Sequence, residues 1–309
     1  MKICCFGSLN IDYVYSVEHF VRAGETISTK DRFIVCGGKG LNQSIAMSKA
    51  GASVYHAGNV SAMDGQLLLS TLQANGVDVS FVDKKNTANG HAIIQVDAKG
   101  ENSILLFAGT NKLVSEEQIE TVLSSFEPGD LLVLQNEINM LPQLVYQGHK
   151  KGLKVILNPS PVSGITETVP LSLIDILFAN EKEACYIGGG TTISESVHHL
   201  RTRYPQMTVV CTMGKNGALV FDKEEYFFPA YHVKPIDTTG AGDTFLGFYV
   251  GSMTKRMNIR ECLKYATAAA ALSIQKKGAS ASIPTLVEVE NFILKNHQLH
   301  HDVVQDIYT

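Results

Sequence analysis

The sequence predicts an α/β protein with three layers, in which helices cover both faces of a mostly parallel central sheet. Short apolar runs alternate with amphipathic segments along most of the chain, which is typical of strand–helix–strand units. Two stretches, 13–35 and 91–107, instead alternate apolar and polar residues without a helical period. They predict a small β-sheet beside the main one. At 309 residues the chain is long enough to bury a large core.

The predicted elements follow this alternation in order. Buried strands are expected at residues 3–6, 54–57, 131–134, 155–157, 176–179, 208–211 and 218–221. Helices are expected at 40–50, 65–75, 116–125, 141–150 and 195–204, and a further helix-compatible run covers 245–250. Residues 91–107 predict a hairpin whose turn lies near Lys99 and Gly100. We expect one domain over 1–309, with small-sheet strands from about 11–36 and 88–110.

Charge and cysteine content exclude several classes of protein. The formal net charge is −4, so there is no basic excess to bind the phosphates of a nucleic acid. No apolar run reaches membrane-spanning length, and the short apolar N-terminus, interrupted by Asp12, predicts a first strand rather than a signal peptide. The six cysteines lack metal-ligand spacing, and adjacent Cys4 and Cys5 would point to opposite faces of a strand. We therefore expect reduced thiols in a cytoplasmic protein without nucleic-acid or membrane partners.

The polar C-terminus is expected to be a solvated helix end, with a metal site as the alternative. It contains three histidines, His297, His300 and His301.

The stretch 237–245, Asp-Thr-Thr-Gly-Ala-Gly-Asp-Thr-Phe, predicts an anion site. The side chains just before the apolar helix are absent or small, at Gly240, Ala241 and Gly242. Backbone N–H groups can therefore converge at the positive end of that helix. Asp243 lies inside this turn. A carboxylate beside an anion hole suits a general base that takes a proton from a hydroxyl attacking a phosphoryl group. The simpler alternative is a glycine-rich helix start with Asp243 as its N-cap.

Two further polar clusters lie where ligands gather in parallel sheets. Residues 37–43, Gly-Gly-Lys-Gly-Leu-Asn-Gln, combine bare backbone with the donors Lys39 and Asn42, which fits a small polar ligand. This cluster is not a Walker A loop, and residues 240–242 do not continue into a dinucleotide fingerprint. Asn10 and Asp12 directly follow the first strand and suit the hydroxyls of a polyol. Considered alone, each cluster could also be an ordinary turn without a bound ligand.

Together these clusters resemble the signatures of the ribokinase-like (PfkB-type) sugar and nucleoside kinases. The resemblance covers nearly the whole chain. It rests on Gly-Gly-Lys-Gly-x-Asn-Gln at 37–43 and Asp-Thr-x-Gly-Ala-Gly-Asp-Thr-Phe at 237–245, with Gly-Ser-Leu-Asn-Ile-Asp at 7–12 and Asn-Glu-Lys-Glu at 180–183. It implies the ribokinase-like α/β/α fold, with the small sheet as a lid, and ATP-dependent transfer of the γ-phosphoryl group to a primary hydroxyl. The expected acceptor is D-ribose at O5. The alternatives are another sugar or a nucleoside, or a non-catalytic sugar- or nucleotide-binding regulator.

The resemblance also implies a role for each matching residue. Asp243 would be the general base, beside an anion hole formed by Gly240, Ala241 and Gly242. The residues expected to hold sugar hydroxyls are Asn10, Asp12, Gly38, Lys39, Asn42 and Glu137. Those expected near the nucleotide are Asn180, Thr212, Gly214, Gly217, Gly242 and Thr267. Asn180 and Glu183 would organise Mg²⁺ and its waters. A monovalent cation, K⁺, would be held mostly by backbone carbonyls of Asp237, Thr239, Ser273, Lys276, Gly278 and Ser282.

Simpler interpretations exist for three of these assignments. Glu137 could belong to a surface ion pair, Lys39 could be a solvated loop charge, and Asn180 with Glu183 could form a capping box. The chain departs from the family at Ala23, where proline is usual, and at Thr267, where histidine or asparagine is common. An exposed small sheet is a natural surface for pairing with a second copy, so we expect a homodimer.

Overall fold

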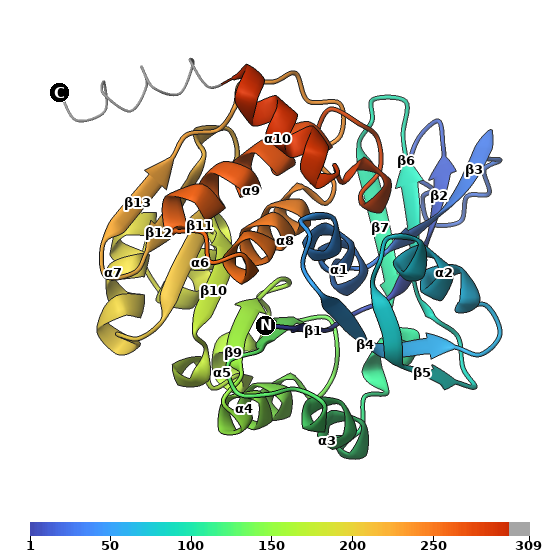
Figure 1. The fold of residues 1–309 in the computed structure, drawn as a ribbon. Helices are drawn as coiled ribbons and strands as arrows, with labels where there is room; N and C mark the ends of the chain where they lie inside the picture. The colour runs from blue at the N-terminus through green and yellow to red at the C-terminus, as the bar shows by residue number, and fades with distance from the viewer. Residues whose placement is uncertain (297–309) are drawn as a thin grey trace.

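The computed structural model describes residues 1–296, which form two β-sheets and their covering helices (Figure 1). The strands of the nine-stranded sheet are, in spatial order, β13 (Glu225–Phe228), β12 (Ala218–Phe221), β11 (Thr208–Thr212), β10 (Ile176–Asn180), β9 (Lys154–Asn158), β8 (Leu131–Gln135), β1 (Ile3–Phe6), β4 (Val54–Ser61) and β5 (Asp78–Lys85). Strand β12 runs antiparallel to both of its neighbours, and the other pairs are parallel. The predicted mostly parallel sheet is confirmed.

Helices cover both faces of this sheet. One face carries α1 (Lys39–Lys49), α2 (Gln66–Ala74), α8 (Ala241–Thr254), α9 (Ile259–Ser273) and α10 (Leu286–Lys295). The other carries α3 (Glu116–Ser124), α4 (Leu141–Lys151), α5 (Ile165–Thr168), α6 (Glu181–Gly188) and α7 (Ile193–Arg203). Within residues 1–296, none of the helices is both long and apolar enough to cross a membrane.

Strand β1 shows how the two cores are built. Ile3 and Cys5 pack into the core on the α8 side, whereas Cys4 and Phe6 pack into the core on the α4 side. Successive side chains of a strand point to opposite faces, so a strand buried on both faces reads as an unbroken apolar run. The predicted opposite orientation of Cys4 and Cys5 is confirmed, and all six cysteines are free thiols.

The second sheet has the strand order β3 (Asp31–Gly37), β2 (Asn10–Ser16), β6 (Gly90–Val96) and β7 (Asn102–Phe107). The predicted hairpin is confirmed, since the Asp97 N–H donates to the Glu101 carbonyl at 3.0 Å across the turn. Strand β2 follows β1 after only three residues, so the small sheet begins at the carboxyl end of a central strand. The solvated helix end expected at the C-terminus, and the alternative of a metal site at its three histidines, lie outside the described residues.

Candidate functional site

Asp243 is the point where segments 37–43 and 237–245 meet. Its carboxylate is 7% exposed and accepts hydrogen bonds from Asn42 Nδ2 at 3.0 Å and Gln43 Nε2 at 2.9 Å. Both donors lie near the start of α1, and Asp243 is the third residue of α8. The two amides satisfy a charge that is largely removed from water. The N-cap of α8 is Gly240, so the alternative in which Asp243 is the cap is wrong.

Small residues allow α1 and α8 to approach closely enough for these bonds. A Cβ at Gly247 would lie 2.2 Å from the Cβ of Ala46, and one at Gly251 would lie 2.5 Å from the Cβ of Ala50. The contacts advance by four residues along both helices in the same direction, so the helices are parallel (Figure 1). Their positive N-terminal ends therefore face the same region, which favours a bound anion.

The turn before α8 lines a cavity, and within this turn the Ala241 N–H donates to the Thr238 carbonyl at 3.3 Å. Gly240 has φ 74°, a conformation that favours glycine, and in the described structure no side-chain hydrogen bond caps the helix at this residue. A cavity of 180 Å³ opens here, lined by Gly240, Ala241, Gly242 and Asp243 together with Lys39 from α1. The geometry is that of an anion-binding loop with a carboxylate at its edge.

Lys39 is half-buried in this cavity, so its interpretation as a solvated loop charge is wrong. Burial acts to lower the pKa of its ammonium group, but the carboxylates of Asp243, Glu137 and Glu183 outweigh burial and raise that pKa overall. The side chain is therefore positively charged at neutral pH and adds to the positive potential near the two helix starts.

Glu137 follows β8 and holds the start of α1 in place. Its Oε2 accepts from the backbone N–H of Lys39 at 3.1 Å and from the hydroxyl of Ser8. The Ser8 hydroxyl in turn accepts from the N–H of Gly40 at 3.3 Å. These two side chains satisfy first-turn N–H groups of α1, whose own N-cap, Gly38, has no side chain to do so. Glu137 is bonded inside the site, so its interpretation as part of a surface ion pair is wrong.

Asn10 lies at the start of β2 and is joined to a residue that sequence analysis did not single out. Its Oδ1 accepts from Asn111 Nδ2 at 2.7 Å, and Asn111 Oδ1 accepts from the Leu9 N–H at 2.9 Å. Gly90 on β6 faces this pair, and a Cβ there would lie 2.0 Å from Asn111 Nδ2. Gly90 therefore leaves the room in which the two asparagines meet.

Asp12 lies on the same strand, two residues further. Its carboxylate packs against Gly37, where a Cβ would lie 2.0 Å from Oδ2. Burial, assisted by the negative charge of Glu137, raises the pKa of Asp12 to about 6. Asp12 and Glu137 thus act on each other electrostatically across the region between the two sheets.

Asn180 and Glu183 form a capping box, which is the simpler of the two interpretations given above for this pair. Asn180 Oδ1 accepts from the Glu183 N–H at 3.0 Å, and Glu183 Oε2 accepts from the Asn180 N–H at 2.9 Å. Both residues also line the 180 Å³ cavity beside Gly240. Residues 1–296 contain no group of three His, Cys, Asp or Glu side chains that could hold a metal ion.

A second cavity of 500 Å³ adjoins the first and shares Thr212 and Gly242 with it. Gly214, Gly217 and Thr267 also line this larger cavity, so five of the six predicted nucleotide residues lie together. The sixth, Asn180, lies in the smaller cavity. The Thr267 hydroxyl is buried and has no hydrogen-bond partner in the described part of the chain.

Asp237 joins the two loops predicted to hold a monovalent cation. Its Oδ1 accepts from the Thr239 N–H at 2.9 Å, and its Oδ2 accepts from the Gly278 N–H at 2.9 Å. Burial acts to raise the pKa of Asp237, but these bonds and the nearby Lys277 lower it overall.

The other three predicted cation residues lie between the end of α9 and a short 3₁₀ helix: Ser273 ends α9, Lys276 follows it, and Ser282 ends the 3₁₀ helix Ser280–Ser282. The Ser273 carbonyl accepts from the Lys276 N–H at 3.1 Å, and the Ser282 hydroxyl donates to the Ala279 carbonyl at 2.9 Å. The Lys276 ammonium group pairs with Glu288 at 3.1 Å. The Asp237 N–H also donates to the carbonyl of Ile274, the residue after Ser273, at 3.2 Å, so the segment around Asp237 is bonded both to the end of α9 and to Gly278.

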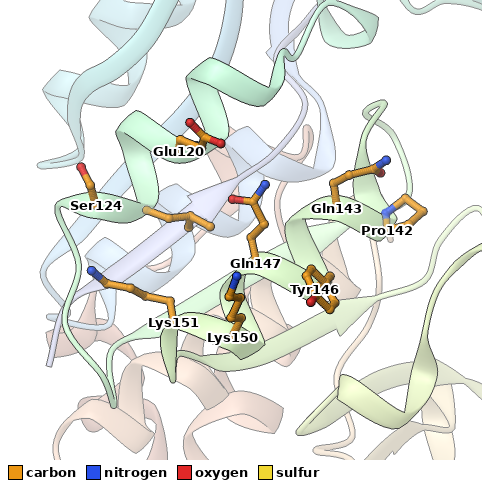
Figure 2. A pocket seen from close by; sticks show the side chains of 9 residues that line it. Glu120, Ser124, Pro142, Gln143, Tyr146, Gln147, Lys150 and Lys151 are labelled. Carbon is orange, nitrogen blue, oxygen red and sulfur yellow. The ribbon is translucent and has the colours of Figure 1, made fainter.

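A third hollow, of 730 Å³, lies elsewhere, and none of the predicted site residues lines it. Figure 2 shows that side chains of α3 and α4, including Glu120, Tyr146 and Lys150, surround it. It belongs to the helical layer opposite α1 and α8, so it is separate from the glycine-rich loops.

Sequence analysis gave no role to three buried side chains of the site: Gln43, Gln135 and Asn111. Gln43 stands inside a quoted motif, and Gln135 is a polar residue that ends an apolar run, which is a usable signal. Asn111 lies in a short 3₁₀ helix, Gly109–Lys112, and has no comparable local signal.

The chain is similar to known proteins over most of its length. Residues 1–286 match the model of a family described as pfkB family carbohydrate kinase. The chain is 35% identical to the ribokinase of Haemophilus influenzae over 299 residues, which cover 93% of this chain and 96% of that protein. It is 29% identical to the deoxyribokinase of Salmonella typhi over 309 residues, 96% of this chain and all of that one. The structure of Arabidopsis thaliana ribokinase complexed with ribose and ATP superimposes with a TM-score of 0.83 at 29% identity, covering 94% of this chain and 98% of that one. The chain therefore belongs to the pfkB family of carbohydrate kinases and is an ATP-dependent phosphotransferase that acts on an alcohol group of a sugar.

Proposed function

We propose that this chain transfers the γ-phosphoryl group of ATP to O5 of D-ribose, with Asp243 as the general base. The observation that carries the proposal is the buried Asp243 carboxylate, held by two amides beside a glycine-rich helix start. Asp243 accepts the hydroxyl proton while the sugar oxygen bonds to the γ-phosphorus, the bond to the β–γ bridging oxygen breaks, and ADP leaves. Backbone N–H groups of Gly240, Ala241 and Gly242 stabilise the charge on the transferred group.

The sugar would lie between the small sheet and the start of α1. Carboxylates there accept from hydroxyls, whereas Lys39 and the amides donate to them, which suits a polyol. The Asn42 Oδ1 atom is buried without a partner among residues 1–296, so it remains available as an acceptor for a sugar hydroxyl. The proposed sugar residues are Asn10, Asp12, Gly38, Lys39, Asn42 and Glu137.

ATP would occupy the two adjoining cavities. The 500 Å³ cavity has room for the adenosine part, and its lining combines the small residues Thr212, Gly214, Gly217 and Thr267 with larger apolar side chains such as Tyr231, Val233 and Ile274. The phosphates would then pass Thr212 and Gly242, which both cavities share, toward Asp243.

Asn180 and Glu183 fit Mg²⁺ held through water. One amide and one carboxylate at the phosphate cavity suit a hard cation that keeps most of its waters, and the absence of a larger acidic cluster in residues 1–296 agrees with this. When bound, the ion neutralises phosphate charge. In the protein, the capping box keeps the Glu183 carboxylate at the rim of that cavity.

The loops around Asp237 and Gly278 fit a K⁺ ion held mainly by backbone carbonyls. Their link to the anion hole is direct, because a Cβ at Gly240 would lie 3.0 Å from the Cβ of Ala279 in the second loop. The full proposed set is Asp237, Thr239, Ser273, Lys276, Gly278 and Ser282. A change in this loop would be transmitted to the turn that precedes Asp243.

We also propose that the chain acts as one domain in which the small sheet is a lid that excludes water from the transfer. By strand register, Asp12 shares its face of this sheet with Val35 and Leu106, and Phe33 and Ile104 follow on the same face. These four apolar side chains are exposed in the single chain. Their burial against the same face of a second copy would form a homodimer.

Deoxyribose is the second candidate acceptor, favoured by the 29% identity to a deoxyribokinase. The test is ADP release with Mg²⁺-ATP and K⁺ against ribose, deoxyribose, fructose, xylulose, adenosine and uridine. Fastest turnover of ribose supports the proposal, and fastest turnover of another compound moves the substrate but keeps the chemistry. No turnover at all, with stabilisation of the fold by sugar or ATP, would instead support a non-catalytic regulator.

A further inference from the structure

We infer that Gln135 positions the general base by acting through Gln43, an inference that rests on the proposed role of Asp243. Gln135 ends β8 and is fully buried, and its Nε2 donates to Gln43 Oε1 at 2.8 Å. Gln43 Nε2 in turn donates to Asp243 Oδ1 at 2.9 Å. Three side chains thus form a hydrogen-bonded row from the central sheet through α1 to α8.

The carboxylate sets the direction of this row. An ionised carboxylate only accepts hydrogen bonds, so Gln43 must turn its amide nitrogen toward Asp243. The Gln43 oxygen then faces Gln135, which must offer its own nitrogen. A glutamine amide can rotate by half a turn with little change in shape, so the donor at Gln135 is what selects the productive orientation of Gln43.

Cys5 continues the row beneath Gln135. Gln135 Nε2 also lies 3.6 Å from Cys5 Sγ, and that thiol donates to the Gly40 carbonyl at 3.6 Å. Burial raises the pKa of the Cys5 thiol to about 11, so it stays protonated at neutral pH. The end of the row opposite Asp243 is therefore a neutral thiol, and its bond to the Gly40 carbonyl fixes it to the start of α1.

The oxygen atom of the Gln135 amide indicates that this residue contributes to the site and not to the stability of the fold. Gln135 Oε1 is buried with no hydrogen-bond partner in residues 1–296, and a Cβ at Gly7 would lie 2.1 Å from it. A buried acceptor without a partner costs free energy that an apolar side chain of similar size avoids. Gln135 lines neither of the two cavities, so its effect on the substrates must pass through Gln43.

The experiment compares the full chain with Gln135→Met, Gln43→Met and the double variant. We measure kcat, the KM values for ribose and ATP, and Tm. Gln135→Met should lower kcat about tenfold, the size expected if Gln43 turns and loses its hydrogen bond to the Asp243 carboxylate, and should leave both KM values within about threefold. The double variant should be no slower than Gln43→Met alone, because both changes break the same row.

Gln118→Met is the matched control. Gln118 is also buried with an unpartnered Oε1 in the described structure, but its Nε2 donates to the Gly58 carbonyl, outside the row. Its kcat should match the wild type. If Gln135→Met fails to fold, Gln135→Leu removes the same donor at the same position and should show the same loss of kcat, whereas Gln43→Met also removes the direct bond to Asp243.

Two results would overturn the inference: wild-type kcat in Gln135→Met, or losses that multiply in the double variant. Asp243→Asn separates this failure from failure of the proposed function. An inactive Asp243→Asn with a fully active Gln135→Met removes only the role of Gln135. An active Asp243→Asn removes the general base and the positioning role with it.

Discussion

Replacement of Gly247 by alanine tests whether the close approach of α1 and α8 holds the catalytic geometry. The added Cβ would lie 2.2 Å from the Cβ of Ala46, whereas carbon atoms in contact settle at about 3.5–4.0 Å. The helices must therefore separate locally by roughly 1–2 Å. Overpacking of this kind destabilises a core by about 1–3 kcal/mol.

The same separation should reduce catalysis. Asp243 lies one helical turn before Gly247, and its bonds to Asn42 and Gln43 are 3.0 and 2.9 Å long. An increase of about 1 Å takes them out of the hydrogen-bond range. A misplacement of this size lowers turnover by roughly 100-fold, so we expect kcat of Gly247→Ala to fall by about 10- to 100-fold.

Gly251→Ala is the control, because its Cβ would lie 2.5 Å from the Cβ of Ala50, one turn further from the site. Both variants should show a lower Tm by scanning calorimetry, but only Gly247→Ala should lose most of its kcat in an ADP-release assay. The double change Ala46→Gly with Gly247→Ala removes the 2.2 Å contact but leaves contacts of 2.9 Å to the Ala46 carbonyl carbon and the Met47 nitrogen, so it should recover only part of that kcat. Wild-type kcat in Gly247→Ala, or equal losses in both single variants, would refute the reasoning.

Three further predictions concern the sugar, the second copy and the cation. Because the pKa of Asp12 is raised to about 6, its carboxylate takes up a proton as pH falls through that value, and kcat/KM for ribose should fall over the same pH range. The pH profile of Asp12→Asn should lack this decrease. A decrease that persists in Asp12→Asn contradicts the assignment of Asp12. Leu106→Glu places a charge on the exposed face of the small sheet and should convert a dimer to a monomer in light scattering, whereas a wild-type chain that is already monomeric excludes this pairing surface. Asp237→Asn should weaken the advantage of K⁺ over Na⁺ in turnover, and equal wild-type rates in the two salts would argue against the cation site.

The strands of the nine-stranded sheet that sequence analysis located are those buried on both faces. Residues 131–134 form an unbroken apolar run because β8 packs against both helical layers. Strand β4 was expected to end at 57 but continues to Ser61, since the polar residues Asn59 and Ser61 at its end are buried without interrupting the strand. Strand β5 was not predicted, because this edge strand carries Asp83, Lys84 and Lys85 in place of an apolar run.

The reactive parts of the site could be predicted because they lie in short contiguous motifs. Asp243 and its glycines form one turn, and Lys39 and Asn42 form another. The partners that hold them could not, since they are brought together only by the fold. Gln135 bonds to a residue 92 positions away, and Asn111 bonds to one 101 positions away. Nothing in the local spacing of these two residues indicates either contact.

Asn180 and Glu183 show a different limit of sequence analysis. Their spacing is that of a capping box, and the structure contains this capping box at the edge of the 180 Å³ cavity. One pair of residues thus satisfies a local rule of helix starts and lies where a metal-binding role is proposed. Spacing alone cannot separate the two roles, because both require an amide and a carboxylate three residues apart.

The rate of a single turnover with ribose and Mg²⁺-ATP, compared between the wild type and Asp243→Asn, tests the central claim most directly. The variant keeps the size and burial of the side chain but removes the base, and general base catalysis contributes roughly 10²- to 10⁴-fold. We predict a loss of about 10³-fold, with the dissociation constants of ribose and ATP changed by less than about threefold. A single-turnover rate within about tenfold of the wild type would contradict the assignment of Asp243 as the base.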